Sequence, residues 1–293
     1  MRDDTRLREP GMKSRFITLL LLALAASSVH ALIALAGGEA GIDRLAWAGS
    51  LLATGSFMGF FVWLMRGKAA RTSAGLHAIL ALTGIGAAIA LLAALRGGPM
   101  LPLFYALVIG LDGCIAYVYW YSRFPDRDRT TLAVGNPLPS FTLKSADGSL
   151  IDSASLVGKT TLLLFYRGNW CPLCMAQIQE IAARYRELAQ RGVQVLLVSP
   201  QSQKHTQELS ARFDAPMQFL VDADNAAARA LGIDAPGGLP MGLQAMGYDS
   251  DSVLPTVLLI DREGRIAWNH LTDNYRVRPE PDTFIAVIDQ LGL

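Results

Sequence analysis

The apolar residues of this 293-residue chain follow one pattern in its first part and another in its second. Nearly continuous apolar runs occupy residues 16–36, 45–65, 73–95 and 100–121, and short polar links separate them. A membrane-spanning helix needs roughly 20 apolar residues, which each run supplies. The pattern therefore predicts an all-α membrane domain over residues 1–122, built as a bundle of four transmembrane helices.

Shorter apolar segments alternate with amphipathic ones after residue 122. Residues 160–166 and 193–199 are continuous apolar runs, typical of strands that are buried on both faces. Between them, apolar positions recur every three or four residues and Gly192 follows, which predicts an amphipathic helix. Because parallel strands need a crossover connection, residues 160–199 are expected to form a β-α-β unit.

The rest of the second part continues this α/β pattern. The sequence predicts a charged linker at 123–134 and a second domain over 135–293. Within that domain we expect a short strand, a helix, a long glycine-rich loop, a hairpin and a final helix, at 217–221, 225–231, 234–252, 255–269 and 282–291.

Composition supports membrane insertion and argues against some partners. The chain is 52% hydrophobic and only 17% charged, which is too apolar for a fully soluble protein. Its formal net charge is +1, and its basic residues do not form a stripe interleaved with aromatic side chains. We therefore expect the lipid bilayer as a partner and no nucleic acid, and the sequence does not indicate an oligomeric state.

The basic residues that flank the apolar runs predict the orientation. They concentrate before the first run, between the second and third, and after the fourth, whereas the other two links have one each, Arg44 and Arg96. Lysine and arginine accumulate on the cytoplasmic side of a membrane. We predict a multi-pass protein of the cell inner membrane whose second domain faces the cytoplasm. If the first run were instead a signal peptide cleaved after Ala31, the second domain would still face inward.

Two features within the apolar runs invite a specific interpretation. Asp112 lies near the middle of the fourth run, and a charge at membrane depth is costly, so it is a candidate functional residue. Its alternative role is a hydrogen bond that packs one helix against another. Gly55 and Gly59 have the spacing of a close helix–helix contact surface.

The three cysteines leave one candidate reactive pair. Cys114 lies within an apolar run, whereas Cys171 and Cys174 occur together in the sequence WCPLC. A structural zinc site needs four ligands, which this sequence does not place nearby, so no metal is expected. A structural disulfide suits a reducing cytoplasm poorly, and a two-residue loop removes little chain entropy. Redox chemistry is the remaining explanation.

The spacing of the pair suits thiol–disulfide exchange. Pro172 is favoured at the first position of a helix, which makes Cys171 the residue that caps it. Free backbone N–H groups and the helix dipole stabilise a thiolate there, and the thiolate is the nucleophile. Cys174 follows one turn later and can attack a mixed disulfide. No organic cofactor is required.

Three stretches carry a family resemblance, namely GNPLPSFTLKSADG, WCPLC after a buried strand, and LPT before VLLID. Together they resemble the thioredoxin-like superfamily, in its peroxiredoxin-like branch of alkyl hydroperoxide reductases and thiol-specific antioxidants, and the resemblance covers residues 133–293. It implies an α/β fold with a central mixed sheet flanked by helices, and an antioxidant redox pair at Cys171 and Cys174. It also implies that Pro255 is a cis proline beside the cysteine pair and that Trp170, directly before Cys171, supports the site.

The resemblance leaves the attacking cysteine open. Aligned with the peroxiredoxin pattern, Cys174 takes the position of the peroxide-attacking cysteine, Arg167 that of a proline, and Cys171 that of a threonine. Thioredoxin analogy and helix-dipole reasoning instead favour Cys171, which we expect to attack, and Arg167 could lower a thiol pKa. The expected function is a membrane-anchored thiol-disulfide oxidoreductase acting on thiol or disulfide proteins. The alternatives are a hydroperoxide peroxidase and a non-catalytic transporter or redox sensor.

Overall fold

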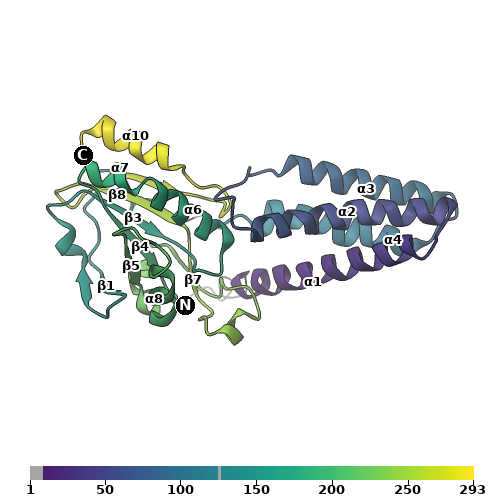
Figure 1. The fold of residues 1–293 in the computed structure, drawn as a ribbon, viewed down its shortest axis with the longest axis horizontal. Coiled ribbons are helices and arrows are strands. Elements are labelled where there is room, and N and C mark those ends of the chain that lie inside the picture. Colours follow the sequence, from purple (N-terminus) through teal and green to yellow (C-terminus); the bar gives the residue numbers. More distant parts are fainter. Residues whose placement is uncertain (1–8, 125–126) are drawn as a thin grey trace. The chain divides into compact units, whose positions relative to one another are not determined.

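The structure is a computed structural model that describes residues 9–124 and 127–293. It divides into two compact units. One contains residues 12–66 and 72–123, and the other contains residues 9–11 and 67–71 together with the chain from Phe124 onward. Figure 1 labels the elements of both units.

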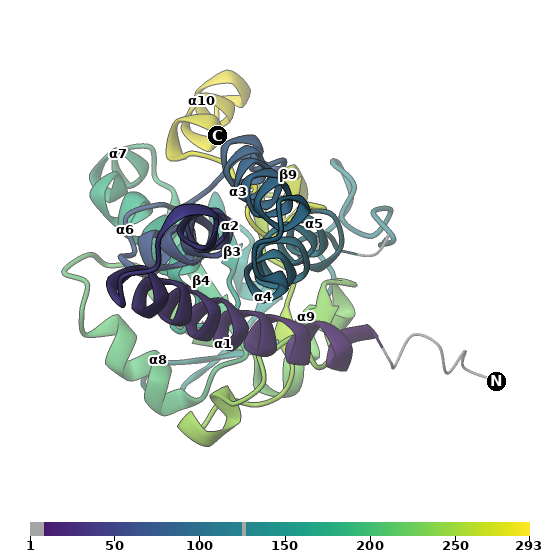
Figure 2. The same ribbon diagram turned by 90° about the vertical axis from the view of Figure 1, so that its right-hand side faces the viewer.

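Four apolar helices make up most of the first unit (Figures 1 and 2). The first three are α1 (Glu9–Ala36), α2 (Gly41–Met65) and α3 (His77–Leu95). The fourth begins as α4 and continues through π-helical and α-helical turns, which are α4 (Met100–Phe104), η1 (Tyr105–Asp112), α5 (Gly113–Ala116) and η2 (Tyr117–Tyr121). All four are long and apolar enough to cross a membrane, which confirms the predicted bundle.

Glycines allow α2 and α3 to pack closely, although not the glycines expected from sequence. A Cβ atom placed on Gly86 would lie 2.5 Å from the backbone nitrogen of Ala53, and one on Gly49 would lie 2.7 Å from the nitrogen of Ala90. A Cβ on Gly59 would meet nothing within 4 Å. The close contact between α2 and α3 is therefore made at Gly49 and Gly86. The expectation that Gly55 and Gly59 form this contact is wrong, because these two glycines lie on another face of α2.

We predict that Gly86→Val destabilises the bundle, whereas Gly59→Val does not. The valine at position 86 must push the two backbones apart, and overpacking of this kind costs about 1–3 kcal/mol. Thermal unfolding of the detergent-solubilised chain should show a lower midpoint for Gly86→Val and an unchanged one for Gly59→Val. Equal midpoints for both variants would contradict the close contact.

A seven-stranded mixed sheet forms the centre of the second unit, in the order β2-β1-β5-β4-β3-β8-β9. The central strand β3 (Thr161–Phe165) is parallel to β4 and antiparallel to β8, and all five of its residues are buried. The other strands are β1 (Thr142–Ser145), β2 (Leu150–Asp152), β4 (Gln194–Ser199), β5 (Gln218–Val221), β8 (Thr256–Ile260) and β9 (Ile266–Leu271). This arrangement confirms the expected α/β class.

Helices flank the sheet (Figure 1). The predicted β-α-β crossover is present, although its helix breaks at Arg184 into α6 (Pro172–Ala183) and α7 (Tyr185–Gln190). The others are α8 (Gln203–Ser210), α9 (Ala226–Ala230) and α10 (Pro281–Leu291). Short turns and a small two-stranded sheet complete the unit, namely η3 (Ser153–Leu156), η4 (Ala223–Asn225), η5 (Leu243–Met246), β6 (Asp234–Ala235) and β7 (Ser252–Val253).

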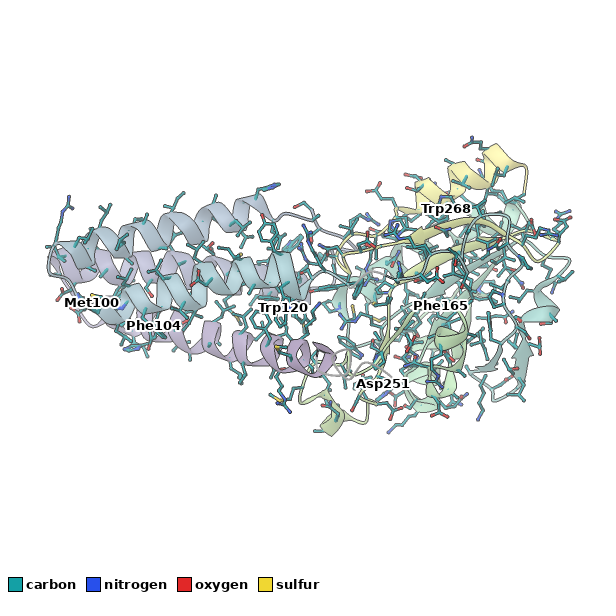
Figure 3. The ribbon with its side chains drawn as sticks, turned by 180° about the vertical axis from the view of Figure 1, so that it is seen from behind. Met100, Phe104, Trp120, Phe165, Asp251 and Trp268 are labelled. Atoms are coloured by element: carbon teal, nitrogen blue, oxygen red, sulfur yellow. The ribbon has the colours of Figure 1, made fainter. Side chains whose placement is uncertain are left out.

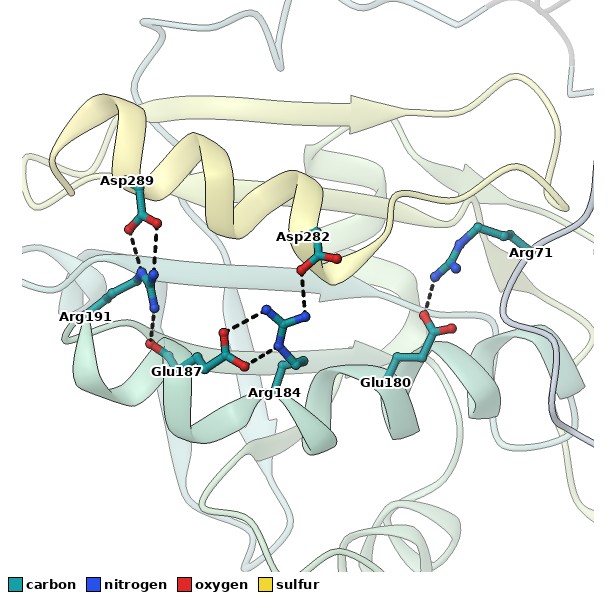
Figure 4. Close-up of polar contacts among 7 residues, drawn as sticks. All are labelled: Arg71, Glu180, Arg184, Glu187, Arg191, Asp282 and Asp289. Carbon is teal, nitrogen blue, oxygen red and sulfur yellow. Dashed lines mark hydrogen bonds and ion pairs between the residues drawn. The ribbon is translucent and has the colours of Figure 1, made fainter.

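The core and a row of ion pairs position the helix that begins at the cysteines. Phe165, at the end of β3, lies in the hydrophobic core of this unit (Figure 3). Arginines between α6 and β4 reach α10, where Arg184 contacts Asp282 and Arg191 contacts Asp289, each at 2.6 Å (Figure 4). Exposed pairs contribute little individually, so burial in the core supplies most of the stability.

Candidate redox site

The two cysteines lie where β3 gives way to α6. Cys171 is the N-cap residue of α6 and Pro172 occupies its first turn, as the sequence predicted. Cys174 lies in the same turn, and neither cysteine is part of a disulfide. Only 2% of Cys171 and none of Cys174 is exposed, so the pair is more deeply buried than the capping position alone suggested. The Cys171 side chain accepts no capping hydrogen bond.

A buried arginine contacts both sulfurs. Arg278 lies between β9 and α10 and is 4% exposed. Its Nη2 atom is 3.4 Å from Cys174 Sγ and 3.8 Å from Cys171 Sγ. The same guanidinium donates to the carbonyl of Tyr275 and to Gln177 Oε1, both at 3.0 Å. A buried guanidinium needs a compensating negative charge, and the Cys174 thiolate supplies one.

The surroundings of Cys174 favour its ionised form. Burial by itself raises the pKa of a thiol. Here that effect is outweighed by a hydrogen bond from the Cys171 thiol, by the charge of Arg278 and by the backbone N–H of Arg167, which together hold the pKa of Cys174 at about 5. Cys174 is therefore a thiolate at neutral pH.

Cys171 is affected in the opposite direction. Burial raises its pKa, and donation of its proton to Cys174 and the negative charge of Cys174 raise it further. Cys171 thus keeps its own proton under conditions in which Cys174 has lost its proton. This order differs from the sequence-based expectation that Cys171 attacks, because Arg278 lies closer to Cys174 and because the Cys171 sulfur is not exposed at the helix end.

Arg167 and Trp170 lie in the segment between the end of β3 and Cys171, and their side chains contact each other. The guanidinium carbon of Arg167 lies 4.7 Å from the ring centre of Trp170 and 5.2 Å from that of Tyr275. Its Nη2 donates to the carbonyl of Gly238 at 2.7 Å, which ties the glycine-rich loop to the site. Arg167 is half-buried, and its charge acts to lower the Cys171 pKa without reversing the increase.

A hydrogen-bond network holds the turn that leads into Cys171. Gln201 is buried, and its Oε1 accepts from the backbone N–H of Asn169 at 2.8 Å. Its Nε2 donates to the hydroxyl of Tyr166 at 3.2 Å. Burial, and then the negative charge of Cys174, raise the pKa of Tyr166, so its hydroxyl stays protonated. The turn is thus fixed by Gln201 from the segment that follows β4, and Gln201 is itself held by Tyr166 directly after β3.

Pro255 does not have the conformation that the resemblance implied. Among the described residues no peptide bond is cis, so the Leu254–Pro255 bond is trans and that expectation is wrong. Pro255 is buried directly before β8, whose first residue Thr256 pairs with Phe165 at the end of β3. It therefore directly precedes β8, the strand next to the one that leads to the cysteines.

Asp112 lies at the end of the π-helical segment η1, in the first unit, and its side chain is exposed rather than buried among neighbouring helices. Functional sites often contain π-helical turns. A role for Asp112 remains a prediction. Within the described residues no group of three or more His, Cys, Asp or Glu side chains could hold a metal ion.

Sequence reasoning missed Arg278, which contacts both sulfurs, and Gln177, which accepts a hydrogen bond from Arg278. The only signal was a pair of arginines in the short segment YRVRP before the last helix, far from the cysteines in sequence. Gln177 fell within the amphipathic pattern of α6 as a polar residue on its buried side.

The C-terminal part of this chain is similar to several known proteins. Residues 134–269 match the model of the AhpC/TSA family. A Coxiella burnetii protein that carries the name peroxiredoxin bcp is 28% identical over 137 residues, covering 47% of this chain and 87% of its own length. The thiol-disulfide oxidoreductase ResA of Bacillus subtilis is 25% identical over 160 residues, covering 55% and 78%. The crystal structure of peroxidoxin BcpB from Mycobacterium tuberculosis superimposes with a TM-score of 0.45 at 18% identity, covering 54% of this chain and 97% of that one.

Proposed function

We propose that this chain, whose C-terminal part is a thioredoxin-like domain of the AhpC/TSA family, is a membrane-anchored thiol peroxidase. The observation that carries the proposal is the buried Arg278 beside Cys174, which keeps that thiol ionised. Hydroperoxides are the proposed substrates, Cys174 the attacking residue and Cys171 the resolving one. Relatives named as peroxiredoxins and thiol-disulfide oxidoreductases favour an enzyme over a non-catalytic sensor.

The geometry supports a balanced two-step reaction. In the first step the Cys174 thiolate attacks the distal oxygen of ROOH, a sulfur–oxygen bond forms, and the oxygen–oxygen bond breaks to leave a sulfenic acid and RO⁻. The Cys171 thiol gives its proton to RO⁻, which leaves as ROH. In the second step the Cys171 thiolate attacks the Cys174 sulfur, a disulfide forms and hydroxide leaves. An external thiol then reduces the disulfide.

Burial of the sulfurs favours a small substrate. With 2% and 0% of the two cysteines exposed, a folded protein cannot reach either sulfur unless the surrounding loops move. A hydroperoxide of a few atoms needs a much smaller opening. Tyr248 on the glycine-rich loop donates to Asn169 Oδ1 at 2.5 Å, which ties this loop to the turn before Cys171.

The purified, detergent-solubilised chain tests the proposal with hydrogen peroxide under single-turnover conditions. Consumption of one peroxide per chain, with formation of a Cys171–Cys174 disulfide detected by mass spectrometry, is the expected result. Reduced protein that remains in the dithiol form after minutes in excess peroxide would exclude a peroxidase.

A second candidate is disulfide exchange with protein substrates, which the sequence favoured. The supporting observation is that the two cysteine side chains are hydrogen-bonded to each other and that one nitrogen of Arg278 contacts both sulfurs. Reduction of insulin disulfides by the reduced chain, faster than its reaction with peroxide, would favour this function over the first.

Arg71 supports one part of the predicted topology, namely that the link between α2 and α3 lies on the same side of the membrane as the redox domain. This residue belongs to the link between α2 and α3, yet residues 67–71 are part of the same compact unit as the redox domain. Arg71 pairs with Glu180 of α6 (Figure 4) and with Glu280 at 3.3 Å, and its neighbour Ala70 is 2% exposed. Segments of one compact unit share a compartment, so two spans must separate the link from the domain. We propose that this compartment is the cytoplasm.

Cysteines introduced at exposed positions test this orientation. Because the native pair is buried, Glu263→Cys on the β8–β9 turn and Ala40→Cys between α1 and α2 are better reporters. In intact cells a membrane-impermeant maleimide should label Ala40→Cys alone, and lysis should expose Glu263→Cys. Labelling of Glu263→Cys without lysis would place the redox domain outside.

A further inference from the structure

Gln177 has a buried N–H group without an acceptor beside the reactive sulfurs. The residue is 2% exposed, and its Nε2 atom finds no hydrogen-bond partner among the described residues. Leaving a buried donor unsatisfied costs about 1–3 kcal/mol, and such groups in native proteins call for an explanation such as a catalytic role. The question is which acceptor this amide serves.

The orientation of the amide follows from chemistry. Arg278 Nη1 lies 3.0 Å from the Gln177 side chain, and a guanidinium can only donate hydrogen bonds. The atom that faces Arg278 must therefore be the carbonyl oxygen Oε1, and the N–H₂ end points elsewhere. An exchange of the two ends would set donor against donor, so the unsatisfied atom is Nε2.

The position of Gln177 on α6 places it beside Cys174. The two residues are three apart on one helix, so they share a face, with Cβ atoms roughly 5–6 Å apart. Both are buried, and both bond the same guanidinium, Cys174 through Nη2 and Gln177 through Nη1. Neighbouring Gln179 on the same helix is exposed.

We propose that Gln177 is a catalytic residue whose Nε2–H group donates to the oxygen of a bound hydroperoxide. This inference rests on the proposed peroxidase function. As the Cys174 thiolate attacks the distal oxygen and the oxygen–oxygen bond breaks, negative charge moves onto the departing RO⁻ oxygen, which then takes the proton of Cys171. A donor fixed in advance by its own hydrogen bond to Arg278 stabilises that charge without reorganisation.

The inference also accounts for the substrate class. The Gln177 amide, held by Arg278, offers an N–H group to an oxygen acceptor in a buried site next to the Cys174 thiolate. A hydroperoxide oxygen accepts this bond, whereas the sulfur of a disulfide is a weak acceptor and gains little from it. Gln177 thus favours the peroxide reaction over disulfide exchange at the same thiolate.

Two variants and one control test the role at a pH of about 9, where Cys174 is ionised. Gln177→Leu removes both ends of the amide, Gln177→Glu keeps an acceptor for Arg278 but no donor, and Gln179→Leu is the exposed control on the same helix. For each variant the rate of reaction with hydrogen peroxide is divided by the rate of Cys174 alkylation by iodoacetamide. Alkylation reports the thiolate and needs no oxygen donor, so the ratio isolates the donor.

We expect the ratio to fall at least about tenfold in both Gln177 variants and to stay unchanged in the control, since loss of one such donor costs roughly 100-fold or more in other enzymes. An unchanged ratio in Gln177→Glu, which preserves the shape of the side chain, would overturn the inference even if Gln177→Leu folds poorly. A parallel fall of both rates would assign Gln177 to holding Arg278 and also overturn it. If the wild-type protein does not react with hydrogen peroxide, that result would instead refute the peroxidase proposal itself.

Discussion

Replacing Cys174 by serine is expected to abolish the reaction with hydroperoxide, whereas Cys171→Ser should retain its first step. The reason is that Arg278 and the N–H of Arg167 stabilise negative charge on Cys174, while Cys171 holds the proton. A serine at position 171 still offers an O–H donor to Cys174, so the thiolate should survive that change. The loss in Cys174→Ser should be complete, because a serine hydroxyl is not ionised at neutral pH.

Trapping of sulfenic acid distinguishes the two cysteines. Cys171→Ser exposed to one equivalent of hydrogen peroxide should accumulate a dimedone adduct on Cys174, since no resolving thiol is present. Cys114→Ser is the control, because this third cysteine is buried in the bundle and should not affect either step. A dimedone adduct on Cys171 in the Cys174→Ser protein would restore the order that the sequence suggested.

The elements around the site could be predicted from sequence because each has a local cause. The continuous apolar run at 160–166 became β3, which is buried on both faces, and Pro172 begins α6 with Cys171 as its N-cap. The four membrane-length helices followed from apolar length alone. The hairpin of β1 and β2 and helix α8 were not predicted, because these segments are short and polar and owe their structure to contacts with the sheet.

The sequence could not predict in the same way which of the two cysteines is ionised. Arg278 is 104 residues from Cys174 in sequence and reaches it only through the fold. Helix-dipole reasoning assigned the thiolate to the capping residue, and that reasoning is sound for an exposed sulfur. Here both sulfurs are buried, and in a low-dielectric interior the nearest full charge outweighs the partial charge of a helix end.

We expect Arg278→Met to slow the reactions of Cys174 strongly. Without the guanidinium, burial dominates and the pKa of Cys174 should rise to at least its ordinary value of about 8.5. At pH 7 the thiolate fraction would then fall from nearly complete to about 3%, so reaction with peroxide and with iodoacetamide should both slow about 30-fold. Arg278→Lys keeps a positive charge but not the fork of donors, and should be intermediate.

A pH profile separates loss of the charge from loss of the fold. The thiolate is the reactive form, so the wild-type alkylation rate should be flat at neutral pH and fall as pH drops through about 5. In Arg278→Met the same fall should begin near pH 8.5, and raising the pH should restore the rate. The matched control is Arg262→Met on the exposed β8–β9 turn, which should keep the wild-type profile.

The lowered pKa of Cys174 also makes the stability of the fold depend on pH. The folded-state pKa of Cys174, about 5, lies below the value of about 8.5 expected in the unfolded chain. The unfolded state therefore binds more protons between these values, so the thiolate–Arg278 pair stabilises the reduced fold fully above about pH 8.5. This contribution shrinks as pH falls and is lost as pH passes through about 5. Reduced Arg278→Met should lack this dependence, and denaturant titrations at pH 5.5 and 8 that change equally in both proteins would show that Arg278 does not hold the thiolate.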